Sequence, residues 1–251
     1  MLKELRKAWA YLVIGWQDAV TYRTEAFLWV IMDSIPVLSV IFVWQAIYQN
    51  KTSIAGISLA QMVTYYFIMI FTDSATGAHF DTWLINYIKD GELASQLTKP
   101  ISIFTRFSIE ELSYKLIRNP LAFLFSVLVL FLISGFMPLS QVSFKNLPLY
   151  LIFVFLGFCL SVMINFITSA FAFWLQEATS LINLRWWTGA LFSGQMFPLF
   201  IMPQKMQALA GFLPFKYLIY VPIQILTGEL KNCRAELMGV VFWLFFYGKG
   251  D

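Results

Sequence analysis

The stretch PLYLIFVFLGFCLSVMINFITSAFAF, which covers Pro148–Phe173, contains no charged residue and decides the class of fold. A helix needs about 20 mostly apolar residues to cross the ~30 Å hydrocarbon core of a bilayer, and this stretch exceeds that length. Three other stretches qualify readily, and a fourth qualifies with polar interruptions: 26–48, 60–80, 120–138 and 181–201.

The last apolar run, 237–247, covers only about 16 Å at the rise of an α-helix. A sixth span is therefore short on the sequence alone. Either its helix begins in the polar segment before it, or the chain stops early.

The composition agrees with a membrane protein. Hydrophobic residues make up 59% of the chain and charged residues 12%, against about 45–50% and about 25% in a soluble domain. So few charges do not coat a globule of this size, which disfavours a soluble fold, a nucleic-acid binder and a disordered chain. The sequence predicts an all-α polytopic membrane protein with a single transmembrane domain over 1–251.

Before the first span, residues 2–23 form an amphipathic pattern. Its apolar residues recur at steps of three and four and define one helical face. Charged residues occupy the opposite face. These two faces are Leu2, Leu5, Trp9, Leu12, Val13, Trp16 and Val20, and Lys3, Glu4, Arg6, Lys7 and Asp18. A basic helix of this kind lies in the membrane interface; a signal peptide would need an unbroken apolar region and a small-residue cleavage site.

Lysine and arginine residues predict the orientation, because they are enriched in cytoplasmic connections. The N-terminal segment, the second loop and the fourth loop hold ten of them, and the first and third loops hold two, Lys51 and Lys145. The N-terminus is therefore predicted to be cytoplasmic. The connection 202–236 then faces outside with four positive residues, against the rule.

The second loop contains a short helical pattern, Glu92–Thr98, between Gly91 and Pro100. Leu93 and Leu97 stand four residues apart and give it one apolar edge. A second amphipathic piece, 101–117, follows, with Arg106/Glu110 and Glu111/Lys115 at the spacing of helical ion pairs. Two interpretations stay open: a solvated connector, or a docking site for a cytoplasmic partner.

The connection after the fifth span is apolar but interrupted. Pro203, Pro214, Pro222 and Lys216 disfavour one continuous helix over 206–227. We expect two short helices, joined at Leu213–Phe215, that dip into the membrane from one side. The alternative is an amphipathic surface loop.

Two acidic residues lie inside predicted spans, where ionisable groups are costly and usually functional. Asp33 and Asp73 are each seven residues from a predicted cytoplasmic end, which is about 10 Å at helical rise. They either share a site on the path of the substrate and favour cationic or zwitterionic substrates, or are neutralised by local partners, namely Ser34, Thr72, Ser74 or Thr76.

The sequence lacks other recognisable chemistry. It has no Walker A pattern to hold ATP phosphates, so ATP-driven transport needs a partner. His79 has no second His or Cys at ligand spacing, and no metal site is predicted.

Two motifs carry a resemblance to a known family. Ile88…Gly91-Glu92-Leu93…Leu97…Lys99-Pro100 resembles the signature G-x-L-x-x-x-L-x-(K/R)-P, and Met202-Pro203…Leu213-Pro214-Phe215…Pro222…Gly228 resembles L-P…L-P-F…P…G, with Met202 in place of the first Leu. Both patterns belong to the permease subunits of the type-2 ABC exporter family, in its bacterial branch of uncharacterised six-span permeases.

The resemblance implies a multi-pass permease in a bacterial plasma membrane, with an N-terminal interface helix, six spans, a cytoplasmic coupling helix over 92–98 and an external re-entrant hairpin over 203–226. It implies that the permease pairs with a second one, identical or similar, and that ATP and Mg²⁺ are bound by a separate cytoplasmic ABC ATPase and not by this chain. The implied docking and hairpin residues are Gly91, Glu92, Leu93, Ser95, Leu97, Lys99 and Pro100, and Pro203, Pro214, Phe215 and Pro222.

One departure from the family concerns the last helix, which is normally longer and ends in a basic tail; here the sequence stops at 247–251. Other classes of function stay open beside a non-catalytic exporter subunit. One is an ion-gradient-driven secondary transporter with Asp33 and Asp73 as cation or proton sites, which the lack of an evident inverted repeat disfavours. Another is a membrane-embedded enzyme or assembly factor, which the lack of a catalytic constellation disfavours.

Overall fold

The fold was analysed in a computed structural model, which describes residues 2–49, 51–54, 56–134, 142–175, 178–230 and 232–248. Over these residues the chain is helical and forms no strand beyond an isolated bridge between Ile54 and Ile57. The structure thus confirms the all-α class. The sequence departs from the family at its last helix and the residues after it, and residues 249–251 of that region lie outside the described residues.

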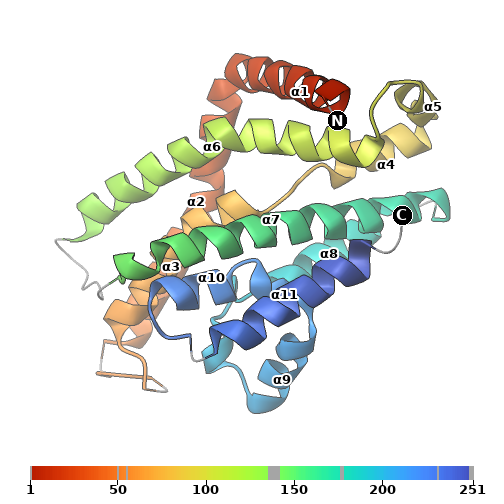
Figure 1. Ribbon diagram of the computed structural model, residues 1–251. Coiled ribbons are helices and arrows are strands. Elements are labelled where there is room, and N and C mark those ends of the chain that lie inside the picture. Colours follow the sequence, from red (N-terminus) through yellow and green to blue (C-terminus); the bar gives the residue numbers. More distant parts are fainter. Residues whose placement is uncertain are drawn as a thin grey trace.

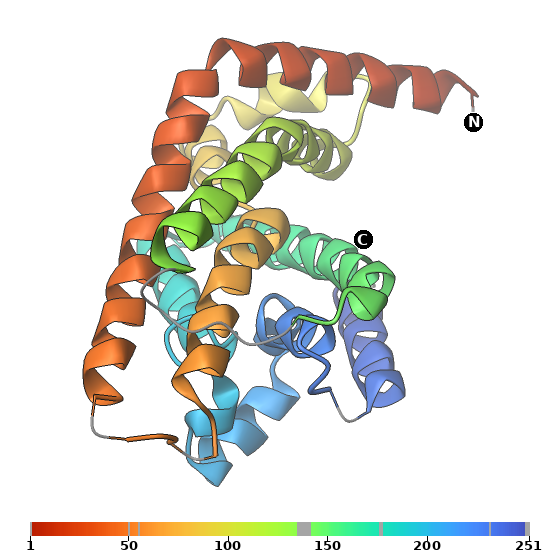
Figure 2. The same ribbon diagram turned by 90° about the vertical axis from the view of Figure 1, so that its left-hand side faces the viewer.

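The chain turns sharply between its first two helices and then runs back along the second. Helix α1 (Leu2–Thr21) leads at Tyr22 into α2 (Arg23–Ile47), and Figure 2 shows α1 lying across the top of α2. Helix α3 (Leu59–Thr76) returns beside α2. Its start is fixed locally, because the Ser58 amide donates to Gln61 Oε1 (3.0 Å) and the Gln61 amide donates to Ser58 Oγ (3.3 Å), which is a capping box.

The second loop is more helical than expected. After α3 come α4 (Asp81–Lys89) and α5 (Leu93–Leu97), followed by the long helix α6 (Ile103–Ser134). The amphipathic piece 101–117 and the span 120–138 are therefore not separate, as far as Ser134, where the described part of that span ends. Pro120 lies inside α6; it removes one backbone hydrogen bond, and the helix continues through it.

Helix α7 (Leu147–Ala170) lies between two short 3-10 turns, η1 (Phe144–Asn146) and η2 (Phe171–Phe173). The next helix, α8 (Ala178–Phe192), ends well before the expected Ile201. Gly194 follows with φ of +89°, where a Cβ would lie 2.5 Å from the Tyr65 hydroxyl. The Tyr65 hydroxyl donates to Gly194 O (2.9 Å) and the Tyr66 hydroxyl to Met196 O (3.0 Å), so two α3 tyrosines stabilise this turn.

The proline-rich connection forms short helices, namely η3 (Leu199–Ile201), α9 (Gln204–Phe212), η4 (Pro214–Tyr217) and α10 (Tyr220–Leu226). The chain bends by 81° between Gln204–Phe212 and Pro214–Leu226. The last helix, α11 (Cys233–Gly248), begins in the polar segment before the apolar run, which is the first of the two alternatives raised by the sequence.

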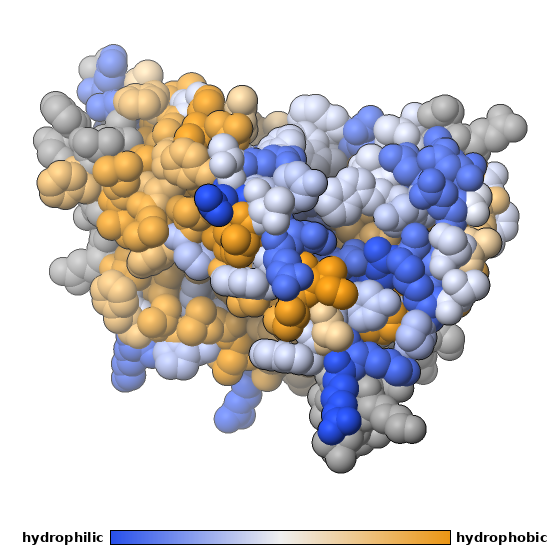
Figure 3. All heavy atoms as spheres, turned by 90° about the horizontal axis from the view of Figure 1, so that it is seen from above, coloured by the Kyte–Doolittle hydropathy of each residue, from blue (hydrophilic) through white to orange (hydrophobic). Residues whose placement is uncertain are grey.

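Three described helical segments are long and apolar enough to cross a membrane: 23–47, 103–129 and 144–173. The bent pair in 204–226 makes a fourth if it is counted as one span. Large apolar side chains are exposed along these helices, including Phe27, Met32, Phe123, Leu128 and Phe155. In the view from above, apolar residues gather on the left, away from the side on which Figure 1 places α4 and α5 (Figures 1 and 3). Such surface suits lipid and not water.

Helix α1 packs closely on α6. A Cβ on Gly15 would lie 2.8 Å from both Cβ and Oγ of the fully buried Ser113, so glycine permits the approach. Trp9 and Trp16 are exposed on α1, where an interface helix would present them to lipid headgroups.

We predict that Gly15→Ala lowers the melting temperature, because the added methyl group overpacks the α1–α6 contact at a cost of about 1–3 kcal/mol. The matched control is Gly211→Ala on α9, where a Cβ meets nothing within 4 Å and the same gain in helix propensity applies. Thermal unfolding in detergent compares the two. Adding Ser113→Gly to Gly15→Ala should recover part of the loss; equal melting of the two alanine variants would contradict the packing argument.

Candidate functional site

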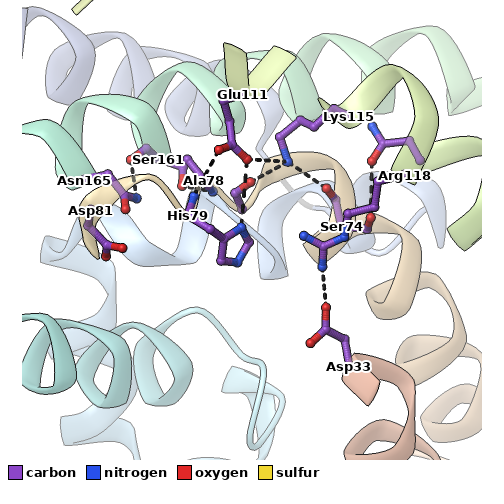
Figure 4. A network of polar contacts seen from close by, with 12 residues as sticks. Asp33, Ser74, Ala78, His79, Asp81, Glu111, Lys115, Arg118, Ser161 and Asn165 are labelled. Carbon is purple, nitrogen blue, oxygen red and sulfur yellow. Dashed lines mark hydrogen bonds and ion pairs between the residues drawn. The ribbon is translucent and has the colours of Figure 1, made fainter. Parts of the chain in front are cut away.

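Three charged side chains lie on one face of α6 and are buried. Glu111, Lys115 and Arg118 are 8%, 3% and 6% exposed, and they turn toward the end of α3 (Figure 4). The sequence placed these residues in a cytoplasmic loop. They are buried because α6 is one helix, so its charged first half continues into the packed part of the molecule.

Lys115 holds the end of α3. Its Nζ donates to Ser74 O (2.7 Å) and to Gly77 O, and it lies 3.9 Å from Glu111 Oε1. The carbonyls at a helix C-terminus lack intrahelical partners and carry partial negative charge, so an ammonium group satisfies both. Glu111 in turn accepts from the His79 amide (3.3 Å). The chain segment just after α3 is therefore bound to α6.

The two acids that the sequence predicts to lie within spans have different environments. Asp33, on α2, pairs with Arg118, whereas Asp73, on α3, accepts a hydrogen bond from Gln195 Nε2 (3.3 Å). The two carboxylates and Arg118 line one narrow cavity. The structure thus brings the two carboxylates together, as their matched depth suggested. The sequence did not indicate Arg118 as the partner of Asp33.

The local hydroxyls proposed as partners bond elsewhere. Ser34 donates to Val30 O, Thr76 to Thr72 O, and Ser74 to Asn119 Oδ1, while Thr72 contacts the Tyr150 hydroxyl (2.9 Å). None of these hydrogen bonds goes to Asp33 or Asp73, so the interpretation that the four hydroxyl groups neutralise the two acids is wrong. Whether the two acids meet a substrate stays a prediction.

Another ion pair connects α4 to α8. Asp81, at the start of α4, pairs with Arg185 on α8, and its backbone carbonyl faces Ser169 Oγ of α7 at 3.4 Å. Nothing in the sequence indicates this pair beyond the presence of a charge inside an apolar stretch, which needs a partner when buried.

The predicted docking segment is a short helix, α5, that is held against α6. Gly91 has φ of +73°, and α5 follows it. Leu97 is 66% exposed, whereas Leu93 packs against the cluster that contains the stacked rings of Phe80 and Phe107. Arg106 of α6 donates to Gln96 and pairs with Glu110 (2.6 Å). This pair and Glu111–Lys115 confirm the ion pairs expected from their spacing.

The other predicted docking residues surround this helix. Glu92, Ser95 and Pro100 are exposed, and Lys99 is half-buried. In Figure 1, α5 lies at the upper right, on the side where α11 ends and α1 begins, and the α2–α3 connection lies at the lower left. The segment is therefore placed at one extreme of the molecule.

Of the predicted hairpin prolines, Pro203 and Pro214 lie at starts of helices, and Pro222 lies inside one. Pro203 precedes α9, Pro214 opens η4, and Pro222 lies in the first turn of α10. The Phe215 ring lies 3.6 Å from the place where a Cβ on Gly189 of α8 would stand. The prolines thus divide the segment as the sequence predicted. Among the described residues, no group of three or more His, Cys, Asp and Glu side chains has the arrangement of a metal site.

Over the described residues the chain is helical, and several helices expose apolar surface that suits lipid. This architecture is typical of the membrane component of a transport system. A comparison with protein families identifies the kind of transport system. The model of a family described as ABC-2 family transporter protein matches residues 35–247, and the chain belongs to this family. The resemblance seen in the two motifs is thereby confirmed. A comparison with curated proteins finds no match.

We predict that Lys115→Met destabilises the protein by about 3–5 kcal/mol, because it leaves Glu111 buried without its cation and two carbonyls without a donor. Lys205→Met on α9 is the matched control, since Lys205 is exposed and surface changes usually stay within about 0.5 kcal/mol. Thermal unfolding of the purified chain measures both. A Lys115→Met protein that melts with the wild type would show that Lys115 does not hold α3.

Proposed function

We propose that this chain is the permease subunit of an ABC exporter, which moves a substrate out of the cytoplasm while a separate ABC ATPase binds Mg²⁺ and ATP. The chain itself is non-catalytic in this proposal. Membership of the ABC-2 transporter family over 35–247 carries the proposal. The exposed helix α5, with Leu97 at its surface, supports an ATPase docking site.

The proposed topology has six spans in a bacterial plasma membrane, with the N-terminus and α5 in the cytoplasm. The spans are α2, α3, α6, α7, α8 and α11, and the segment from α9 to α10 is an external re-entrant hairpin. The bend of 81° supports the hairpin, because a segment that reverses within the membrane needs such a break. A second permease, identical or similar, completes the transporter.

The contacts of α5 support a mechanical role. Leu93 and Gln96 connect it to α6. Further along α6, Glu111 and Lys115 bind the end of α3 and the segment after it. A displacement of α5 by an ATPase would therefore reach α3 through buried, hydrogen-bonded contacts. Ion-gradient-driven transport is the alternative, and family membership disfavours it.

We predict that Leu97→Asp weakens association with the proposed ABC ATPase partner and uncouples ATP hydrolysis from transport. A hot-spot residue at a protein interface costs about 2 kcal/mol or more when it is lost, and we expect Leu97 to be one. Because Leu97 is exposed, the variant should fold and insert normally. Co-purification of the ATPase measures the effect.

Leu209→Asp is the control, since Leu209 is an exposed leucine on another short helix, α9, at the opposite end of the molecule in Figure 1. Leu93 is unsuited to this test because it packs against the core. Unchanged co-purification and transport by Leu97→Asp would refute the docking role of α5.

We predict that an impermeant maleimide applied to intact cells labels Ser53→Cys but not Ser95→Cys. Both positions are exposed, one between α2 and α3 and the other on α5, and the background carries Cys159→Ala and Cys233→Ser. The positive residues near the N-terminus and in the second loop support a cytoplasmic position for α5. Labelling at position 95 and not at position 53 would reverse the topology.

A further inference from the structure

A polar cavity of about 90 Å³ lies between the end of α3 and helices α7 and α8, with η4 on a further side. On this measure about 10–15 Å³ holds one water molecule, so the cavity has room for a small organic group. Asp73, Ser193, Gln195, Arg185, Trp186 and Phe215 are among its lining residues.

The charged side chains near the cavity have ion-pair partners within 4 Å, except for Asp73. Glu111 pairs with Lys115, Asp33 with Arg118, and Asp81 with Arg185. Within the described part of the chain Asp73 has no cation within 4 Å, and its recorded hydrogen bond comes from the neutral amide of Gln195. A carboxylate away from water is costly unless a cation accompanies it.

The other walls contain unused binding capacity. The Ser193 side chain is 2% exposed, lines the cavity, and its Oγ has no hydrogen-bond partner among the described residues. Trp186 and Phe215 supply aromatic surface, which attracts cations within about 6 Å of a ring centroid. A carboxylate, a free hydroxyl and two aromatic rings together form a setting for an organic ammonium group.

We propose that this cavity binds an ammonium group of the transported substrate, with Asp73 as its counter-charge and Ser193 as a hydrogen-bonding group. The substrates are then organic amines, or lipids and other amphiphiles with an amine-containing head. That the bound molecule is the transported substrate rests on the proposed permease function; the binding of an ammonium group does not. Asp33 has no part in the site, because Arg118 already neutralises it.

The test is equilibrium binding of radiolabelled choline to the full chain in nanodiscs, without any ATPase. The competitor is 3,3-dimethylbutan-1-ol, the uncharged carbon analogue of choline with the same hydroxyl group. The wild type should bind choline more tightly than the analogue. Asp73→Asn should weaken choline binding about tenfold or more, equivalent to at least ~1.4 kcal/mol, and leave affinity for the analogue unchanged.

The matched control is Asp33→Asn combined with Arg118→Gln, since it removes a carboxylate of the same type together with its cation and should preserve the preference for choline. Ser193→Ala, which changes no charge, should weaken binding of both molecules. A wild type without preference for choline overturns the proposal even if a variant fails to fold, and so does a folded Asp73→Asn protein that keeps the preference. Neither result bears on ATPase docking, which Leu97→Asp tests separately.

Discussion

The fold depends on one ammonium group. Lys115 reaches from the middle of α6 to the carbonyls of Ser74 and Gly77 at the end of α3. Because a helix terminus buried without partners is strongly unfavourable, this contact permits the chain to break at Gly77 inside the molecule and to begin α4 at Asp81. Glu111 offsets the charge of Lys115 and holds the amide of His79.

Two ion pairs join different helices. Arg118 joins α6 to α2 through Asp33, and Arg185 joins α8 to α4 through Asp81. Pairs of this kind add little net stability compared with apolar packing, yet removal of one partner is costly. They therefore specify which helices meet more than they strengthen the contact. Asp73 departs from this arrangement, and the departure coincides with a cavity, which is where a ligand can supply the missing charge.

The sequence predicts the helices better than it predicts their limits. Length and apolarity identified the segments that became α2, α3 and α7, and prolines divided 203–226 correctly because a missing amide acts locally. The split of α6 was wrong, since Glu111, Lys115 and Arg118 resemble a solvated surface when their partners are unknown. Those partners, Ser74, Gly77 and Asp33, are far away in sequence. The end of α8 depends likewise on tyrosines of α3, so no local signal alone determines it.

The same distinction explains what could be foreseen about function. The motif around α5 is recognisable because Gly91 and Pro100 limit a short helix whatever the rest of the chain does. The matched depth of Asp33 and Asp73 also follows from helical rise, and the structure brings both to one cavity. Their difference does not follow, because it depends on Arg118 reaching one carboxylate and not the other. Since a single guanidinium group separates an acid fixed in an ion pair from an acid open to a ligand, functional assignment of intramembrane acids requires the partners of each one and not only its depth.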